Sequence, residues 1–136
     1  MRRSINPAGT SAMGAYSQGL SIPLGDSLLV LTSGQIAADG AGKPLAPGDM
    51  AAQPRIVFDK LAAVLDDAGA SLQEVVKVQI FVTDMGQRQA VSAVRDEYLA
   101  GIDPVSTLVE ISKTVIDGCD IEVEAMAVVE QVGNEE

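Results

Sequence analysis

The sequence predicts an α+β fold in which a mixed β-sheet carries two helices on one face. Two stretches, within residues 53–68 and 90–98, repeat apolar residues with the period of an amphipathic helix. Apolar or alternating stretches typical of strands lie before, between and after them. The resulting order, β-β-α-β-α-β-β, indicates the α+β class.

The N-terminal part predicts an irregular start followed by a β-hairpin. Residues 1–11 contain proline and glycine among small polar residues, so we expect them to be irregular. Residues 16–22 and 27–32 are predicted strands, and the Pro, Gly and Asp residues between them predict the turn. Gly34 follows the second strand, where glycine permits either a bulge or the close approach of a ligand to the backbone.

Two amphipathic stripes predict the helices. The first consists of residues spaced i, i+4, i+7, i+8 and i+11, namely Val57, Leu61, Val64, Leu65 and Ala68. Asp49 is expected to cap this helix, and Pro54 lies either in its first turn or at a kink. The second stripe is Ala90, Val91, Val94 and Tyr98, with Asp84 as its candidate N-cap.

Three further strands are predicted at residues 75–83, 105–111 and 121–129. If the last two pair with each other, Ser106 and Leu108 lie near Glu122 and Glu124 and form a face with the mixed chemistry of a small-molecule pocket. These strands also carry apolar residues on the faces opposite their aliphatic ones, and such two-sided strands suggest oligomerisation or a packed second side. The residues concerned are Phe81, Leu108, Met126 and Val128.

Length and composition predict one domain, residues 1–136, with a solvated tail at 131–136. The hydrophobic content of 47% is enough for a core. No apolar run approaches the roughly 18 residues of a membrane helix, so no membrane association is expected. The single cysteine, Cys119, excludes an internal disulfide framework, and the expected compartment is the cytoplasm.

The charge and the lack of histidine restrict the chemistry. A net charge of −10 argues against a nucleic-acid partner, because phosphate binding needs clustered Lys and Arg. Without histidine there is no His-based triad and no histidine ligand for a metal, so we expect no metal site. Proton transfer must rest on carboxylates, tyrosine, lysine, cysteine or water.

Four sequence blocks resemble the reactive-intermediate deaminase (Rid) family, also called the YjgF/YER057c/UK114 family. They are GAYSQG at 14–19, LTSGQI at 31–36, VKVQIFVTD at 76–84 and IEVEAMA at 121–127. The resemblance covers residues 12–129. It implies a chorismate-mutase-like fold and a homotrimer with a small-molecule pocket at each subunit interface. It also implies hydrolysis of reactive enamines or imines without a metal or organic cofactor.

The same resemblance implies the site residues. Glu122 matches the acidic residue that orients the attacking water, and Ser33 and Gly34 match the strand end that lines the pocket. The other positions implied in the pocket are Tyr16, Ser92, Ser106 and Leu108. From the residues alone, the pattern favours a solvated strand residue at Glu122 over a functional one, and Tyr16 either gates the pocket or only packs.

Ser106 departs from the family pattern, since active members have an arginine there. That arginine binds a substrate carboxylate through charge-assisted hydrogen bonds worth roughly 1.5–3 kcal/mol each. Ser106 is either an inert filler or a hydroxyl donor to a neutral ligand. Arg88, one turn before Ser92, is a candidate substitute cation or an ordinary surface residue, and Lys113 is a weaker candidate.

Two functions therefore remain open. The first is a Rid-type hydrolase acting on an enamine, imine or related C=N substrate. The second is a non-deaminating homologue that binds a small metabolite or serves a specialised pathway. Ribonuclease activity, claimed for some relatives, does not fit the acidic charge and the missing histidine.

Overall fold

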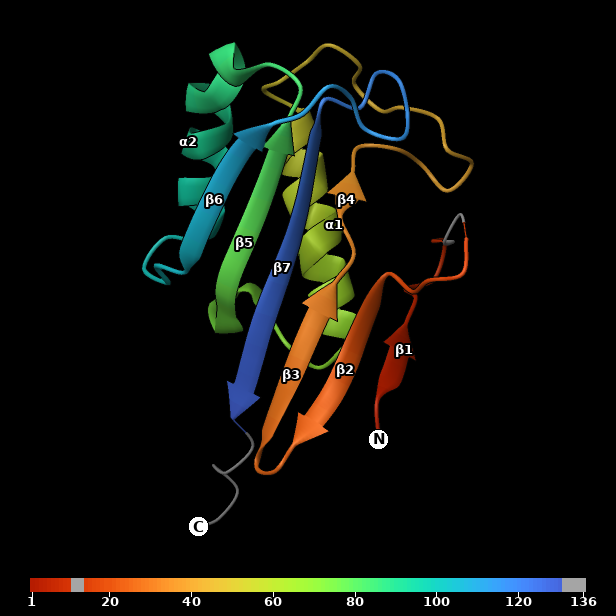
Figure 1. Cartoon of the computed structure of the whole chain (residues 1–136), viewed down its shortest axis with the longest axis vertical. Helices are drawn as coiled ribbons and strands as arrows, with labels where there is room; N and C mark the ends of the chain where they lie inside the picture. The colour runs from red at the N-terminus through yellow and green to blue at the C-terminus, as the bar shows by residue number, and fades with distance from the viewer. Residues whose placement is uncertain (11–13, 131–136) are drawn as a thin grey trace.

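The computed structural model describes residues 1–10 and 14–130 and contains a mixed sheet with two helices on one face (Figure 1). The helices are α1 (Gln53–Asp67) and α2 (Arg88–Tyr98), and single 3₁₀ turns, η1 (Leu72–Glu74) and η2 (Met85–Gln87), flank β5. The strands are β1 (Arg3–Ile5), β2 (Gly19–Leu24), β3 (Ser27–Thr32), β4 (Gln35–Ile36), β5 (Val75–Val82), β6 (Val105–Glu110) and β7 (Ile121–Glu130). They lie in the order β1-β2-β3-β7-β5-β6, and β4 also pairs with β7. The predicted fold class is therefore confirmed.

The core lies between the sheet and α1. The apolar stripe of α1 is completely buried, and α1 packs against β3, β4 and β7. The aliphatic face of β5 belongs to the same core cluster. Alternating positions of β5, among them Val78, Ile80 and Val82, point into this core. The opposite face of the sheet has no helix and faces the viewer in Figure 1.

The helix starts follow local capping rules, with one correction. α1 begins at Gln53, and Pro54 lies in its first turn. The N–H groups of the first turn have no acceptor within the helix, so the missing N–H of proline costs little there. Asp49 does not cap α1 itself. Its side chain accepts hydrogen bonds from the N–H groups of Ala51 and Ala52 and so caps the turn before the helix. The Asp84 side chain likewise caps η2, and α2 follows at Arg88.

The N-terminal expectations are partly wrong. Residues 1–11 are not irregular throughout, because β1 pairs with β2 and buries Ile5 in the core. The β2–β3 hairpin is confirmed, although β2 begins at Gly19 rather than at position 16. The short strand β4 was not expected from the sequence. Residues 131–136, the predicted tail, lie outside the described residues.

β6 and β7 do not pair, contrary to the expectation from the sequence. Both pair with β5, β6 in parallel and β7 antiparallel, so β5 separates them. The physical reason is the α2 crossover, which returns β6 parallel to β5 and leaves the other edge of β5 for β7.

The registers place the predicted pocket residues on two faces. Ser106 and Leu108 align with Val78 and Ile80 on the helix side. Glu122 aligns with Phe81 on the open face, and Glu124 lies beside it on that face. The sequence prediction that Ser106 and Leu108 lie beside Glu122 within one chain is therefore wrong.

The open face is apolar, as expected, where β3 pairs with the second half of β7, whereas Glu122 and Glu124 make it acidic at the start of β7. Its paired rows include Leu29 with Val128 and Leu31 with Met126. Phe81 also lies on this face, whereas Leu108 packs against the core on the helix side, which corrects its predicted placement. Across the described ranges, no helix is both long and apolar enough to span a bilayer.

Candidate functional site

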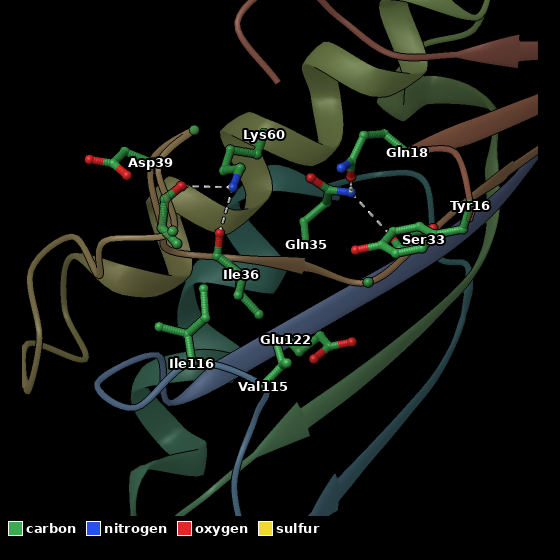
Figure 2. A pocket seen from close by; sticks show the side chains of 14 residues that line it. Tyr16, Gln18, Ser33, Gln35, Ile36, Asp39, Lys60, Val115, Ile116 and Glu122 are labelled. Atoms are coloured by element: carbon green, nitrogen blue, oxygen red, sulfur yellow. Dashed lines mark hydrogen bonds between the residues drawn. The ribbon is translucent and has the colours of Figure 1, made fainter. Parts of the chain in front are cut away.

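A cavity of about 320 Å³ lies where β4 replaces β3 beside β7. Its wall comes from the segment before β2, the β3–β4 connection, the loop after β4, α1, the loop before β7 and the start of β7. The lining residues are Tyr16, Gln18, Ser33, Gly34, Gln35, Ile36, Ala38, Asp39, Gly40, Gly42, Lys60, Val115, Ile116 and Glu122. Figure 2 shows their side chains around this surface. The cavity thus joins Tyr16, Ser33, Gly34 and Glu122, four residues predicted from the sequence.

Glu122 contributes a carboxylate to this cavity from the open face of the sheet. It is the second residue of β7, is only partly exposed, and lies opposite Ile36 of β4 and Phe81 of β5. Within residues 1–10 and 14–130 its carboxylate has no hydrogen-bond or ion-pair partner. Burial, with a further contribution from the charge of Glu124, raises the pKa of Glu122 above its ordinary value. A partly desolvated carboxylate without a partner is suited to hold a water molecule and exchange protons with it.

Gly34 makes the space that this carboxylate occupies. A Cβ atom built at Gly34 would overlap the Glu122 carboxylate and would lie 2.7 Å from both its Cγ and Cδ atoms. The glycine therefore leaves room for this flexible carboxylate, and it does not serve a left-handed backbone, since its φ is not positive. The sequence left a bulge or the close approach of a ligand open at Gly34, and the neighbour that the structure shows there is the Glu122 side chain.

Hydrogen bonds fix the loop that carries Ser33. Its N–H donates to the Gln18 carbonyl at 2.8 Å, and its Oγ donates to the Ser17 carbonyl at 2.7 Å. The buried Gln35 side chain donates from Nε2 to Gln18 Oε1 at 2.9 Å and to the Ser33 carbonyl at 3.2 Å. Tyr16, 48% exposed, lies at the mouth of the cavity. These hydrogen bonds hold Ser33 in place, and its hydroxyl proton is donated to the Ser17 carbonyl.

Lys60 is a cavity residue that the sequence reasoning missed. It extends from α1, and its Nζ donates to the carbonyls of Ile36 at 2.7 Å and of Ala38 at 3.0 Å. Burial lowers the pKa of Lys60, and the neighbouring Cys119 and Asp39 oppose this shift less strongly. A signal existed: Lys60 lies three residues after Val57 and four before Val64, so it occupies a position of the apolar stripe.

The other predicted residues do not join this cavity within one chain. Ser106 lies on the edge strand β6, where its Oγ is 3.3 Å from Nη1 of Arg95, the donor. These two residues line a separate cavity of about 300 Å³. Arg88 is exposed at the start of α2, and Ser92 is partly buried one turn later.

Lys113 and Cys119 do not contribute to the candidate site. Lys113 is exposed and does not line the cavity of Glu122. Cys119 is buried, its Sγ donates to the Ala37 carbonyl, and burial raises the pKa of its thiol. That pKa shift opposes a nucleophilic role, as the sequence indicated. In the part of the chain that the structure describes, no cluster of three or more Cys, Asp or Glu side chains is placed to hold a metal ion.

Comparison with known proteins gives closely related sequences and folds. Residues 7–129 match the family model described as Endoribonuclease L-PSP. The chain is 35% identical to Protein DfrA of Myxococcus xanthus, over 86% of this chain and 87% of that protein. It is 32% identical to 2-iminobutanoate/2-iminopropanoate deaminase of Escherichia coli, over 87% and 90% of the two chains. The crystal structure of Rv2704 from Mycobacterium tuberculosis, a member of the YjgF/YER057c/UK114 family, matches with a TM-score of 0.78 and 28% identity, over 95% of this chain and 100% of that one.

Proposed function

Because the chain belongs to the Endoribonuclease L-PSP family, which includes the YjgF and Rid proteins, we propose that it hydrolyses a reactive enamine or imine in the cavity around Glu122. The observation that carries this proposal is Glu122 itself, an unpaired and partly desolvated carboxylate in a cavity of small-molecule size. The name of the Escherichia coli relative, an iminobutanoate deaminase, supports the reaction class.

The proposed chemistry needs only water and a proton carrier. The reacting form is the iminium, the imine protonated on nitrogen, which an enamine reaches by taking a proton on carbon. Water adds to its C=N carbon while the Glu122 carboxylate takes one proton of the water, which gives a neutral carbinolamine. Glu122 then returns this proton to the nitrogen, and the carbon–nitrogen bond breaks as the carbinolamine hydroxyl passes its proton back to the Glu122 carboxylate, so a C=O group and ammonia leave. The raised pKa of Glu122 favours this exchange, because the group must both accept and return a proton.

The remaining cavity residues orient the substrate. Gly34 leaves backbone exposed beside the Glu122 carboxylate, and Ser33 is fixed next to it by its two hydrogen bonds. Tyr16 lies at the mouth, where its ring covers a bound ligand. None of these contacts requires a cofactor.

We further propose a homotrimer in which β6 of a neighbouring subunit closes the cavity. The uncovered apolar sheet face supports an assembly, and β6 is an exposed edge strand that carries Ser106 and Leu108. Ser92 reaches the cavity only in such an assembly. The contact between Arg95 and Ser106 supports Arg95, rather than Arg88 or Lys113, as the cation beside that position. Arg95 is, however, already paired with Asp96 at 2.9 Å.

The second candidate function is a non-deaminating homologue that binds a small metabolite. Ser106 favours it, since a neutral hydroxyl cannot replace the charge-assisted bonds of an arginine. We do not propose the ribonuclease activity that the family description names. Lys60 is the single Lys or Arg among the described residues that line the cavity, whereas a phosphate backbone needs clustered cations. The cytoplasm remains the expected compartment.

Turnover of freshly generated 2-aminoacrylate by the natural protein and by Ser106→Arg separates the two functions. Activity of the natural protein supports the deaminase. Activity of the variant alone supports a cavity retuned for another ligand. Activity in neither protein contradicts the deaminase proposal.

A further inference from the structure

A second cavity, of about 240 Å³, lies on the helix side of β4. Ile36 pairs with Glu122 on the open face of the sheet. Gln35 pairs with the buried Val123, so its side chain points to the helix side. The second cavity adjoins the first and shares Gln35 and Lys60 with it, but Glu122 does not line it. Its lining residues are Gly9, Thr10, Gln18, Gln35, Ala38, Asp39, Gly40 and Lys60.

The Gln35 side chain leaves one acceptor open in this cavity. Gln35 is 3% exposed, and its Nε2 donates to Gln18 Oε1 and to the Ser33 carbonyl. Its Oε1 accepts no hydrogen bond from the residues that the structure describes. Every fully enclosed side-chain N or O atom of those residues has a partner, so this oxygen is open to the cavity. In Figure 2 it lies on the side of the Gln35 amide that faces Lys60.

Lys60 supplies a donor to the same cavity. Its Nζ has three N–H groups, and the carbonyls of Ile36 and Ala38 take two of them. Within the described ranges no carboxylate forms an ion pair with Lys60. The third N–H is therefore available to a ligand. Together, Lys60 and Gln35 offer one donor and one acceptor.

The charges of the cavity favour a neutral ligand. Among the described residues that line it, Lys60 is the single cation and Asp39 the single anion. Asp39 is exposed at the rim, where its Oδ1 accepts from the N–H groups of Ala41 and Lys43. An anionic ligand would face Asp39 and the Gln35 oxygen, and a cationic ligand would face Lys60. A neutral group that carries both an acceptor and a donor meets neither obstacle.

We propose that this cavity binds the amide group of a small neutral molecule, a carboxamide or a urea. The ligand C=O accepts from Lys60, and the ligand N–H donates to Gln35 Oε1. The inference goes beyond the proposed hydrolase and does not depend on it. Because Gln35 also holds the Ser33 carbonyl, an occupied cavity would contact the loop that lines the site of Glu122.

The test is a chemical-shift titration of the isotope-labelled natural protein with acetamide, acetone and acetate. Acetone has the shape of acetamide but no N–H, and acetate is an anion. Acetamide should shift the side-chain NH₂ signals of Gln35 to saturation and leave the backbone signal of Glu122 unchanged. Acetone should bind about 10-fold more weakly, as expected when a buried acceptor receives no hydrogen bond.

Three results of this titration overturn the inference. Equal binding of acetone and acetamide would show that the ligand N–H has no acceptor. Tighter binding of acetate would show a site for anions. A shift at Gln35 that does not saturate would show that the cavity holds water alone.

A variant tests the donor. Lys60→Met removes the ammonium group at similar side-chain length, so it should weaken acetamide binding about 10-fold or more. Lys60→Arg keeps a cationic donor and should retain binding, as should Lys43→Met, since Lys43 is exposed and outside the cavity. Unchanged binding in a folded Lys60→Met overturns the role of Lys60. Lys60 also holds β4, so thermal melts check folding, and the probes on the natural protein decide if the variant is unfolded.

Discussion

The carboxylate of Glu122 lies where the folded chain favours its protonated form. Its pKa in the folded protein is above the ordinary value of 4.5, chiefly because of burial. Between the unfolded and folded pKa values, the folded state binds more protons, so stability falls as the pH rises through this window. Above the window, the charged Glu122 therefore costs stability.

Glu122→Gln should raise the melting temperature at pH 7. Because the amide carries no charge to desolvate, the difference from the natural protein should shrink as the pH falls toward 4.5. Thermal melts across this range measure it. Glu130→Gln, at the exposed end of the same strand, is the control and should change little. A destabilised Glu122→Gln at pH 7 would show that Glu122 has a partner in the folded assembly.

Gly34→Ala should lower the melting temperature because the added Cβ meets the Glu122 side chain. The added Cβ overlaps the carboxylate, and the backbone at this position is open to any residue. In a Glu122→Ala background the same substitution should therefore cost much less. Melting temperatures of the two single variants and the double variant give this coupling. Additive losses would place the obstruction elsewhere.

The start of α1 depends on one buried side chain. Gln53 is fully buried and joins three segments: its Nε2 donates to the carbonyls of Ala46 and Gly118, and its Oε1 accepts from the N–H of Asp120. These bonds fix the long loop after β4 and the loop before β7, which both line the cavity. Leaving such buried groups without partners costs about 1–3 kcal/mol for each group.

Gln53→Leu should therefore lower the free energy of unfolding by about 3 kcal/mol or more. Arg55→Ala, two residues further along α1, should cost much less, although Arg55 forms a two-bond ion pair with Glu97 between the helices. The difference follows from burial, since the Arg55–Glu97 pair is exposed. Urea denaturation of both variants measures it, and equal losses would contradict the ranking.

Elements with a strong local pattern, and the hairpin between neighbouring strands, were predictable from the sequence, whereas the pairings of strands distant in the sequence were not. The α1 stripe and the β2–β3 hairpin are explicit in the order of apolar residues. β1 and β4 are too short for any period, and they form strands only because β2 and β7 offer them an edge. That β5 lies between β6 and β7 depends on the crossover, which local patterns do not encode.

The candidate site was likewise predictable from the sequence only in part. Family resemblance indicated Tyr16, Ser33, Gly34 and Glu122, which the fold does bring into one cavity. Lys60 was missed although a lysine within the apolar stripe of α1 is a signal, and Gln35 was missed because a two-residue strand has no distinctive local pattern. Their roles arise from the place where β4 meets α1.

The open face of the whole molecule carries apolar pairs, such as Leu29 with Val128, that have no second layer in the single chain. In the proposed homotrimer every subunit carries the same net charge of −10, so apolar contact rather than charge drives the association. This supports the proposed homotrimer.

Val128→Asp should dissociate the assembly. It places a charge on the open face, where Val128 is 38% exposed in the single chain. Light scattering should report three times the chain mass of 14.1 kDa for the natural protein and for Leu45→Asp, a loop control, and a smaller mass for Val128→Asp. A natural protein that is monomeric would remove the proposed closure of the cavity by β6.

The role of Glu122 is tested by the rate of ammonia release from freshly generated 2-aminoacrylate, measured for the natural protein and for Glu122→Gln in the same oligomeric state. We predict measurable turnover by the natural protein and none above the uncatalysed rate by the variant, although the variant is folded and assembled. Glutamine keeps the shape of the side chain but cannot accept the proton of water. Turnover by Glu122→Gln at the natural rate would contradict the role of Glu122, and with it the proposed site.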